Sequence, residues 1–335
     1  MELALHGSGR TSPNPLVGCV IVENNSIIGE GFHAEAGKPH AEVNAFNNVK
    51  QPERLKGATL YVNLEPCAHF GKTPPCAPLI VEKGIQRVVI ANRDPFEAVD
   101  GRGIDILRKA GIEVIIGCEE ESGEWLNRRF FTFHRKKRPY IILKLAQSAN
   151  GLMDRNRESG DRGVNWITAP ETQYLTHTWR SEEDAILIGT RTAQIDNPSL
   201  TVRRIEGRHP HRLLIDRELS VPANGKIFNE DAPTTVFNDL KDGKNGHVNF
   251  VQLDFTKPVL NQIASWCYQN NLQSILVEGG ANTIDRFAKT DLWDEARIIT
   301  GQPVFDSGLA TPEIGGEMME SYQSGLDQIT IIRNR

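Results

Sequence analysis

One histidine, one glutamate and two cysteines have the types and spacing needed for zinc chemistry. His40 is followed two residues later by Glu42, and Cys67 and Cys76 come further along the chain. An imidazole and two thiolates suit Zn²⁺, and three protein ligands leave the fourth tetrahedral position open for water. We therefore predict that His40, Cys67 and Cys76 bind one Zn²⁺ per chain, with Glu42 as the catalytic proton carrier beside it.

The order of these residues indicates a reaction class. His-x-Glu followed by Pro-Cys and a second cysteine is typical of zinc nucleobase deaminases. Zinc lowers the pKa of its water to about 7, so hydroxide can attack a ring carbon that bears an amine. Glu42 would pass the water's proton toward the ring nitrogen and the leaving ammonia. The spacing Cys67-x8-Cys76 departs from the common Cys-x-x-Cys. A structural zinc with His69 as fourth ligand, or buried free cysteines, is the alternative.

Further motifs surround these residues. They are Asn14-Pro15, Val17-Gly18, and Glu65-Pro66-Cys67 continuing to Cys76 as Cys-x-His-x-Gly-x-Thr-Pro-Pro-Cys. Together with the pair His40/Glu42, they resemble the bifunctional deaminase–reductases of riboflavin biosynthesis. The resemblance favours a base or ribose contact for Asn14, with an ordinary turn asparagine as the alternative.

Other deaminase substrate contacts are expected from position. The loop between the two cysteines is pinned at both ends by metal, so His69, Lys72 and Thr73 should overhang the pocket, with Lys72 as a phosphate partner. His33 follows an expected strand and is a further candidate, an exposed loop histidine being the alternative.

The second half of the chain continues the resemblance. Trp166-Ile167-Thr168, the segment Asp196 to Arg203, and Val277-Glu278-Gly279-Gly280 are similar to the reductase half of that family, which resembles dihydrofolate reductase and uses NADPH. A glycine pair between a strand and a helix can bind phosphate, although a tight turn without a ligand is the alternative. The resemblance implies NADPH contacts from Ala146, Trp166, Thr192, Asp196, Gly280, Ala281, Asn282 and Thr283. It implies sugar-phosphate contacts from Lys144, Arg180, Leu200, Arg203 and Glu278.

One departure from the family pattern leaves rival interpretations open. The family commonly has Ser-Leu-Asp-Gly where this chain has Ser148-Ala149-Asn150-Gly151. One rival is therefore a regulatory protein whose reductase half binds a ligand without activity. The other is a nucleoside, guanine or tRNA adenosine deaminase fused to a non-catalytic nucleotide-binding domain, which the long Cys67-x8-Cys76 loop disfavours.

Composition limits the setting and the partners. The 335 residues carry a net charge of −5, without the basic footprint expected for nucleic-acid binding. The sequence has no long apolar run of the kind that inserts into a membrane or directs secretion, so neither is expected. Five cysteines are too few and too scattered for a disulfide framework, which favours a reducing, cytoplasmic setting. We expect a small phosphorylated pyrimidine as substrate and a possible homo-oligomer.

The order of apolar runs predicts an α/β protein with two domains. A hairpin near residues 17–32, a helix from His40 to Val49, and alternating strands and helices predict a cytidine-deaminase-like mixed sheet covered by helices. A second mixed sheet with helices, dihydrofolate-reductase-like by the resemblance, should follow. The basic run His134 to Arg138 is expected to be a solvated linker, which divides the chain into a zinc-dependent deaminase domain, 1–136, and an NADPH-dependent reductase domain, 137–335.

Overall fold

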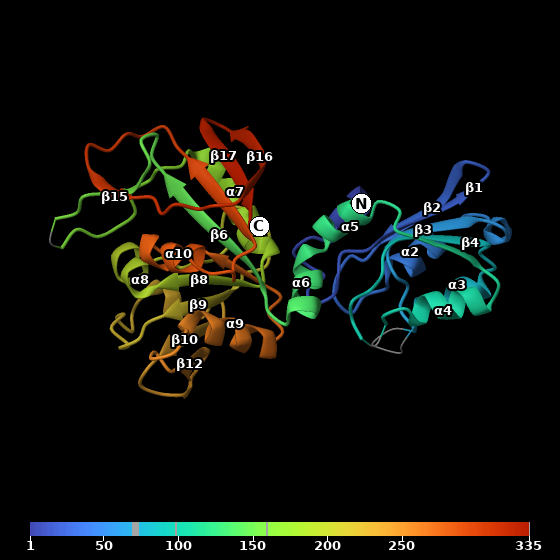
Figure 1. Ribbon diagram of the computed structural model, residues 1–335, viewed down its shortest axis with the longest axis horizontal. Helices are drawn as coiled ribbons and strands as arrows, with labels where there is room; N and C mark the ends of the chain where they lie inside the picture. The colour runs from blue at the N-terminus through green and yellow to red at the C-terminus, as the bar shows by residue number, and fades with distance from the viewer. Residues whose placement is uncertain (69–73, 98, 159, 335) are drawn as a thin grey trace. The chain divides into compact units, whose positions relative to one another are not determined.

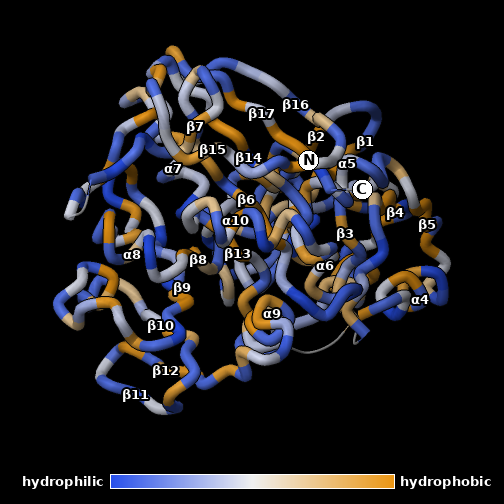
Figure 2. Tube along the Cα trace, turned by 60° about the vertical axis from the view of Figure 1, so that its left-hand side comes forward, coloured by the Kyte–Doolittle hydropathy of each residue, from blue (hydrophilic) through white to orange (hydrophobic). Residues whose placement is uncertain are grey.

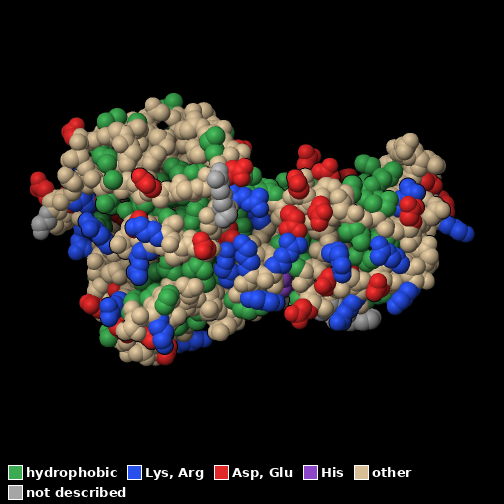
Figure 3. Space-filling model, viewed as in Figure 1, with side chains coloured by type: hydrophobic (Ala, Val, Ile, Leu, Met, Phe, Trp, Pro, Cys, Tyr) green, Lys and Arg blue, Asp and Glu red, His purple; other side chains and the backbone are tan. Residues whose placement is uncertain are grey.

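The computed structural model describes residues 1–68, 74–97, 99–158 and 160–334. The chain divides into two compact units, Met1–Lys137 and Arg138–Arg335, and both contain a sheet covered by helices (Figure 1). The expectation of an α/β chain with two mixed sheets is confirmed. Acidic and basic side chains both occur over the visible face of each unit (Figure 3), in keeping with the small net charge.

The first unit is built on a five-stranded sheet in the order β2-β1-β3-β4-β5. The strands are β1 (Gly18–Glu23), β2 (Ser26–Phe32), β3 (Thr59–Leu64), β4 (Arg87–Asn92) and β5 (Glu113–Ile116). β1 pairs antiparallel with β2 and β3, whereas β3, β4 and β5 run parallel. Because parallel strands bring their carboxyl ends to one edge, the segments that follow β3 and β4 lie next to each other there.

Helix α2 (Ala41–Asn47) packs on the β1–β2 hairpin and presents its N-terminus at that edge. A glycine makes this approach possible, because a Cβ at Gly31 would lie 2.4 Å from the backbone nitrogen of Ala45. The remaining helices are α1 (Glu2–Leu5), the 3-10 turn η1 (Pro52–Leu55), α3 (Cys76–Glu82), α4 (Arg102–Lys109), α5 (Glu120–Leu126) and α6 (Arg128–Lys136). The core between sheet and helices contains fully buried Ile21, Leu60, Ile80, Ile90 and Leu107.

The second unit is built on a ten-stranded sheet in the order β11-β12-β10-β9-β8-β13-β6-β14-β17-β16. Its strands are β6 (Tyr140–Gln147), β8 (Ala185–Gly189), β9 (His211–Ile215), β10 (Thr234–Asn238), β11 (Gly243–Asn245), β12 (Val248–Gln252), β13 (Ser274–Val277), β14 (Glu295–Thr300), β16 (Glu317–Ser324) and β17 (Asp327–Arg333). The strands from β12 to β14 are parallel, and β11, β17 and β16 are added antiparallel at the edges.

Buried strands explain the apolar runs of this half. β6, β8 and β13 lie at the centre of the sheet, and residues such as Ile141, Leu187 and Leu276 are fully buried, as expected for parallel strands covered on both faces. Figure 2 shows hydrophobic segments along β8 and β9. The helices are α7 (Pro170–Glu182), α8 (Thr190–Asp196), η2 (Lys226–Phe228), α9 (Val259–Gln269) and α10 (Ala281–Ala288), and β7 (Leu152–Arg155) pairs with β15 (Gly308–Ala310) in a separate ribbon.

The basic run 134–138 is solvated only in its middle. Arg135, Lys136 and Lys137 are exposed, as expected, whereas the two ends of the run pack against the protein. His134 lies in α6 against the rings of Phe130 and Phe133. Arg138, whose side chain is 11% exposed, donates two hydrogen bonds to Asp294. The charges looked solvated because a sequence does not reveal partners that lie 156 residues away.

Candidate active sites

The three predicted zinc ligands converge at the carboxyl edge of the first sheet. His40 is the N-cap of α2, Cys67 follows β3, and Cys76 is the first residue of α3. The Nδ1 atom of His40 lies 3.5 Å from Sγ of Cys67 and 3.4 Å from Sγ of Cys76. Ligands at about 2.3 Å for sulfur and about 2.0 Å for nitrogen around a tetrahedral centre lie about 3.5 Å apart, so this set fits Zn²⁺.

Over the part of the chain that the structure describes, no fourth histidine, cysteine or carboxylate joins this group. Three protein ligands are the arrangement of a catalytic zinc, which keeps one position for water. His69, Lys72 and Thr73 lie outside the described residues, so their predicted contacts and the four-ligand alternative stay predictions.

Glu42 lies in the first turn of α2, only 3% exposed, beside the ligand set. Burial and the negative charge of Cys67 raise the pKa of its carboxyl group to about 7. A carboxyl group held beside the ligand set can accept a proton from a water bound there and return it to a ligand. The position and the chemistry of Glu42 therefore suit a proton carrier.

Glu65 is a residue of this site that the sequence analysis missed as a functional group. Its carboxylate, 4% exposed, accepts hydrogen bonds from the backbone N–H groups of Asp94, Gly101, Gly103 and Ile104, at 3.0–3.3 Å. The start of α4 is thereby held against the segment that carries Cys67. A Cβ at Gly103 would lie 2.0 Å from the carbonyl oxygen of Pro66. No local signal marks this role, because the four donors lie 29–39 residues away.

Replacing Glu65 by glutamine is expected to loosen the zinc site. The amide nitrogen of the new glutamine cannot accept a hydrogen bond, so at least one of the four backbone N–H groups loses its acceptor. Each N–H group left unpaired should cost roughly 1–3 kcal/mol of stability. Transfer of zinc to a chelating dye should be faster, and the melting temperature of the first unit should fall. NADPH binding by the second unit is the internal control. Zinc transfer and melting at wild-type values would show that the four bonds do not hold the site.

Asn14 and His33 are brought together next to the zinc ligands. His33 is 2% exposed rather than a loop residue in solvent. Its Nδ1 lies 3.1 Å from the carbonyl oxygen of Pro39, so Nδ1 donates and Nε2 accepts from the Asn14 amide at 3.0 Å. These bonds fix the amide with its nitrogen toward His33, which leaves its oxygen as an acceptor for a ligand.

A cavity of about 770 Å³ lies at the carboxyl edge of the second sheet, in the size range of cofactor sites. Every residue predicted to contact NADPH lines it, namely Ala146, Trp166, Thr192, Asp196, Gly280, Ala281, Asn282 and Thr283. Arg191 and Arg217, which the sequence analysis did not single out, line it too.

The glycines of this cavity allow two strand-to-helix turns to meet. β8 and β13 are neighbours. α8 begins directly after β8, and α10 begins after the short turn that follows β13. A Cβ at Gly189 would lie 2.7 Å from Oγ1 of Thr283, and one at Gly280 would lie 3.0 Å from Oγ1 of Thr192. The N-termini of α8 and α10 carry no side-chain cap at their N-cap residues and have little side-chain bulk, which suits the pyrophosphate of a dinucleotide. The cavity therefore fits NADPH.

A buried ion-pair group adjoins the cavity. Nε and Nη2 of Arg180 both lie 2.7 Å from the carboxylate of Glu278, and Nζ of Lys144 lies 3.9 Å from it. Burial alone would raise the pKa of Glu278, but the charges of Arg180 and Lys144 outweigh it and lower the pKa to about 2. Burial lowers the pKa of Lys144. Lys144 and Glu278 line the cavity.

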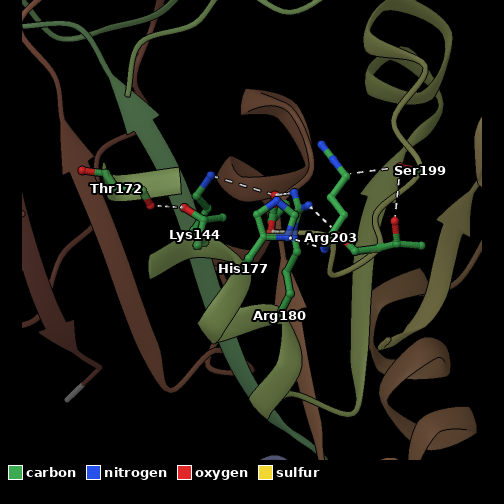
Figure 4. Close-up of polar contacts among 9 residues, drawn as sticks. Lys144, Thr172, His177, Arg180, Ser199 and Arg203 are labelled. Carbon is green, nitrogen blue, oxygen red and sulfur yellow. Dashed lines mark hydrogen bonds and ion pairs between the residues drawn. The ribbon is translucent and has the colours of Figure 1, made fainter. Parts of the chain in front are cut away.

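The other predicted substrate residues lie beside this group rather than in the lining of the cavity. Figure 4 shows Arg180 on helix α7 and Arg203 on a facing loop, with Lys144 on strand β6. Leu200 is 2% exposed in the same loop, and its φ of 54° is left-handed. The structure thus brings all five predicted residues to one end of the sheet.

Asn150 has a structural role outside the cavity lining. Its amide nitrogen donates to the carbonyl oxygen of Phe305 at 2.8 Å, and its oxygen accepts from the N–H of Phe305 at 3.2 Å and from the hydroxyl of Ser148 at 2.8 Å. This pairing needs a donor and an acceptor on one side chain, which an amide has and an aspartate lacks. Asn150 therefore has a structural role in this chain that an aspartate could not fill in the same way.

Family models match both halves of the chain. The cytidine and deoxycytidylate deaminase zinc-binding region matches residues 1–92, and the RibD C-terminal domain matches residues 139–317. Among the described residues, no helix is long and apolar enough to cross a membrane.

Similar proteins match the chain over nearly its whole length. Riboflavin biosynthesis protein RibD of Aquifex aeolicus is 40% identical over 96% of this chain and 90% of its own, and that of Bacillus amyloliquefaciens is 38% identical over 96% and 88%. A solved Thermotoga maritima structure, a diaminohydroxyphosphoribosylaminopyrimidine deaminase/5-amino-6-(5-phosphoribosylamino)uracil reductase, is 35% identical, with a TM-score of 0.90 over 100% of this chain and 96% of that one. Acinetobacter baumannii RibD gives a TM-score of 0.88 at 32% identity, over 100% and 96%. With a zinc-binding deaminase half and a reductase half that uses NADPH, the chain belongs to the RibD family of bifunctional riboflavin-biosynthesis enzymes.

Proposed function

We propose that this chain acts on the two compounds for which the Thermotoga maritima protein is named. The first unit removes an amine from 2,5-diamino-6-(5-phosphoribosylamino)pyrimidin-4-one as ammonia, and the second reduces the ribosyl group of the resulting uracil compound to ribityl. The observation that carries the proposal is the grouping of His40, Cys67 and Cys76 with Glu42 in one unit of a chain whose other unit has the cavity.

In the first step, zinc when bound supplies an activated water for attack on the amine-bearing ring carbon. Glu42 is placed to take one proton from the attacking water and deliver it to the ring nitrogen. It is then placed to move the second proton, from the new hydroxyl group on the ring carbon, to the amine, which leaves as ammonia. Asn14, oriented by His33, offers its amide oxygen to an N–H of the pyrimidine or to the ribose. His69, Lys72 and Thr73, which lie outside the described residues, are proposed as further substrate contacts, with Lys72 at the phosphate.

In the second step, NADPH when bound supplies the hydride. The turns at Gly189 and Gly280 hold its pyrophosphate. Lys144 lines the cavity next to Glu278 and is proposed to hydrogen-bond the ribose, because a buried ammonium group whose pKa is lowered donates a proton readily. Arg180 and Arg203, with the backbone at Leu200, are proposed to bind the phosphate.

The proposed deaminase domain is 1–136 and the proposed reductase domain is 137–335. The absence of an excess of basic residues supports a small-molecule substrate rather than nucleic acid, and the cysteine content supports a cytoplasmic setting. We propose a homo-oligomer, for which sedimentation of the purified protein is the direct measurement.

Replacing Cys67 by alanine is the experiment that tests the metal assignment. With one of three ligands removed, the purified protein is expected to lose zinc and ammonia release together. Cys118→Ala is the matched control, because Cys118 is an exposed free thiol. Atomic absorption should find about one zinc per chain in the control. Full zinc occupancy in Cys67→Ala would contradict the ligand set.

A further inference from the structure

His177 is a buried imidazole at the reductase substrate site that none of the assignments above uses. It lies on α7 three residues before Arg180, so both side chains are on one face of the helix. The residue is 4% exposed. Figure 4 shows His177 next to Arg180, facing the loop that carries Arg203.

The loop that His177 contacts depends on bonds from outside itself. It is irregular, and Asn197 (φ 42°) and Leu200 (φ 54°) have left-handed backbones that residues other than glycine adopt infrequently. Nη1 of Arg212 donates to the carbonyl oxygen of Ser199 at 3.3 Å.

Two consecutive N–H groups of the loop donate to imidazoles. That of Val202 donates to Nδ1 of His209 at 3.2 Å, and that of Arg203 donates to Nδ1 of His177 at 3.3 Å. The bond to His177 is thus the one that fixes the backbone of Arg203 itself against α7.

The bond requires neutral His177 with its proton on Nε2, because a protonated Nδ1 cannot accept. Arg180 on α7 and Arg203 and Arg204 on the loop face the imidazole, and Glu278 faces it from the end of β13. Burial and then these arginines lower its pKa to about 4, while Glu278 opposes them. The acceptor form is therefore the one present at neutral pH.

Arg180 has too few available N–H groups to bind a phosphate alone, so a second cationic side chain is needed. Its Nε and Nη2 are used by Glu278, and Nη1 has only a 3.5 Å contact to the carbonyl oxygen of Thr201. The guanidinium of Arg203 contacts the hydroxyl of Ser199 at 3.3 Å and is otherwise available. A phosphate bound here would be shared between two guanidinium groups on different elements, and the distance between those elements decides the fit.

We infer that His177 is a positioning residue for the sugar phosphate, which holds the backbone of Arg203 at the distance from Arg180 that lets both arginines reach one phosphate. The inference rests on the proposed function and adds a residue to it. His177 acts through Nδ1, which accepts the hydrogen bond from the N–H of Arg203. A side-chain oxygen at the position of Nδ1 should therefore substitute for the imidazole, whereas an oxygen further along the side chain should not.

The test compares two amides at position 177 in the full-length protein. Asparagine places its oxygen near the position of Nδ1, whereas glutamine places it near Nε2. Binding of ribose 5-phosphate to the protein saturated with NADP⁺ is measured by calorimetry, and kcat and KM for reduction are measured with the uracil compound. His211→Asn is the control, because His211 is another partly buried imidazole of this unit, hydrogen-bonded to Thr235.

His177→Gln is expected to weaken ribose 5-phosphate about tenfold and to raise KM similarly, with little change in kcat or in NADP⁺ affinity. His177→Asn is expected to stay close to wild type. Equal affinities for the two variants, or wild-type affinity in His177→Gln, would overturn the inference. Failure of the wild-type protein itself to bind ribose 5-phosphate would instead contradict the proposed phosphate site.

Discussion

Replacing Glu42 by glutamine is expected to leave zinc bound and to slow ammonia release by roughly 10²–10⁴-fold. The amide is nearly the same size, but it cannot carry a proton. Because the proposed reaction uses this carboxyl group more than once, the loss should lie toward the upper end of that range. Ammonia release with saturating aminopyrimidine substrate is the measurement, together with zinc content.

The control for Glu42→Gln is Glu82→Gln, since the Glu82 side chain is 73% exposed and belongs to a helix of the same unit. Reduction of substrate that has already been deaminated should be unchanged in both variants, because the second site is in another unit. Ammonia release by Glu42→Gln within tenfold of wild type would contradict the proton-carrier role.

Replacing Glu278 by glutamine is expected to abolish reduction and to destabilise the second unit by roughly 3–5 kcal/mol. The reason is that Arg180 and Lys144 stay buried while the carboxylate that compensates both charges is lost. Unfolding of the second unit in urea is the measurement, and ammonia release by the first unit is the internal control.

A double variant separates stability from function at this position. Arg180→Met/Glu278→Leu removes both bonded charges, and it should recover part of the stability, because an apolar pair replaces the ion pair while only Lys144 stays without its carboxylate. It should still fail to bind ribose 5-phosphate. Recovery of phosphate binding in the double variant would show that Arg180 is not a ligand.

The stability from this ion pair should depend on pH in one direction. Glu278 has a folded pKa of about 2, below its ordinary value near 4.5, so its contribution is present above pH 4.5. The contribution should be lost as the pH falls from 4.5 toward 2, and Glu278→Gln should reduce that loss. An unchanged acid limb in the variant would contradict the pairing.

Much of the fold and of the zinc site could be predicted because the signals are local. His40, Glu42, Cys67 and Cys76 follow a spacing that one reaction requires, and the apolar runs of β6, β8 and β13 are long enough to identify buried strands. The cavity positions of Gly280 and Thr192 were predicted from the resemblance to the reductase half of the family, and both line the cavity.

Features that depend on distant partners could not be predicted. The charge on Glu65 is satisfied by backbone groups 29–39 residues away, and His177 bonds to a backbone nitrogen 26 residues away. Arg138 was read as solvated for the same reason, and Asn150 as a lost charge although its amide pairs with Phe305. A residue type limits what a side chain can bond to, but only the fold shows what lies beside it.

The most direct test of the two-site account supplies the phosphorylated aminopyrimidine to the purified full-length protein with and without NADPH. Without NADPH, ammonia release should run to completion and the uracil compound should accumulate. With NADPH, one molecule of NADPH should be oxidised for each ammonia released. NADPH oxidation should begin after a lag, and Glu42→Gln should lengthen that lag. NADPH oxidation that precedes ammonia release, or proceeds unchanged in Glu42→Gln, would contradict the order of the two reactions and the assignment of the first site.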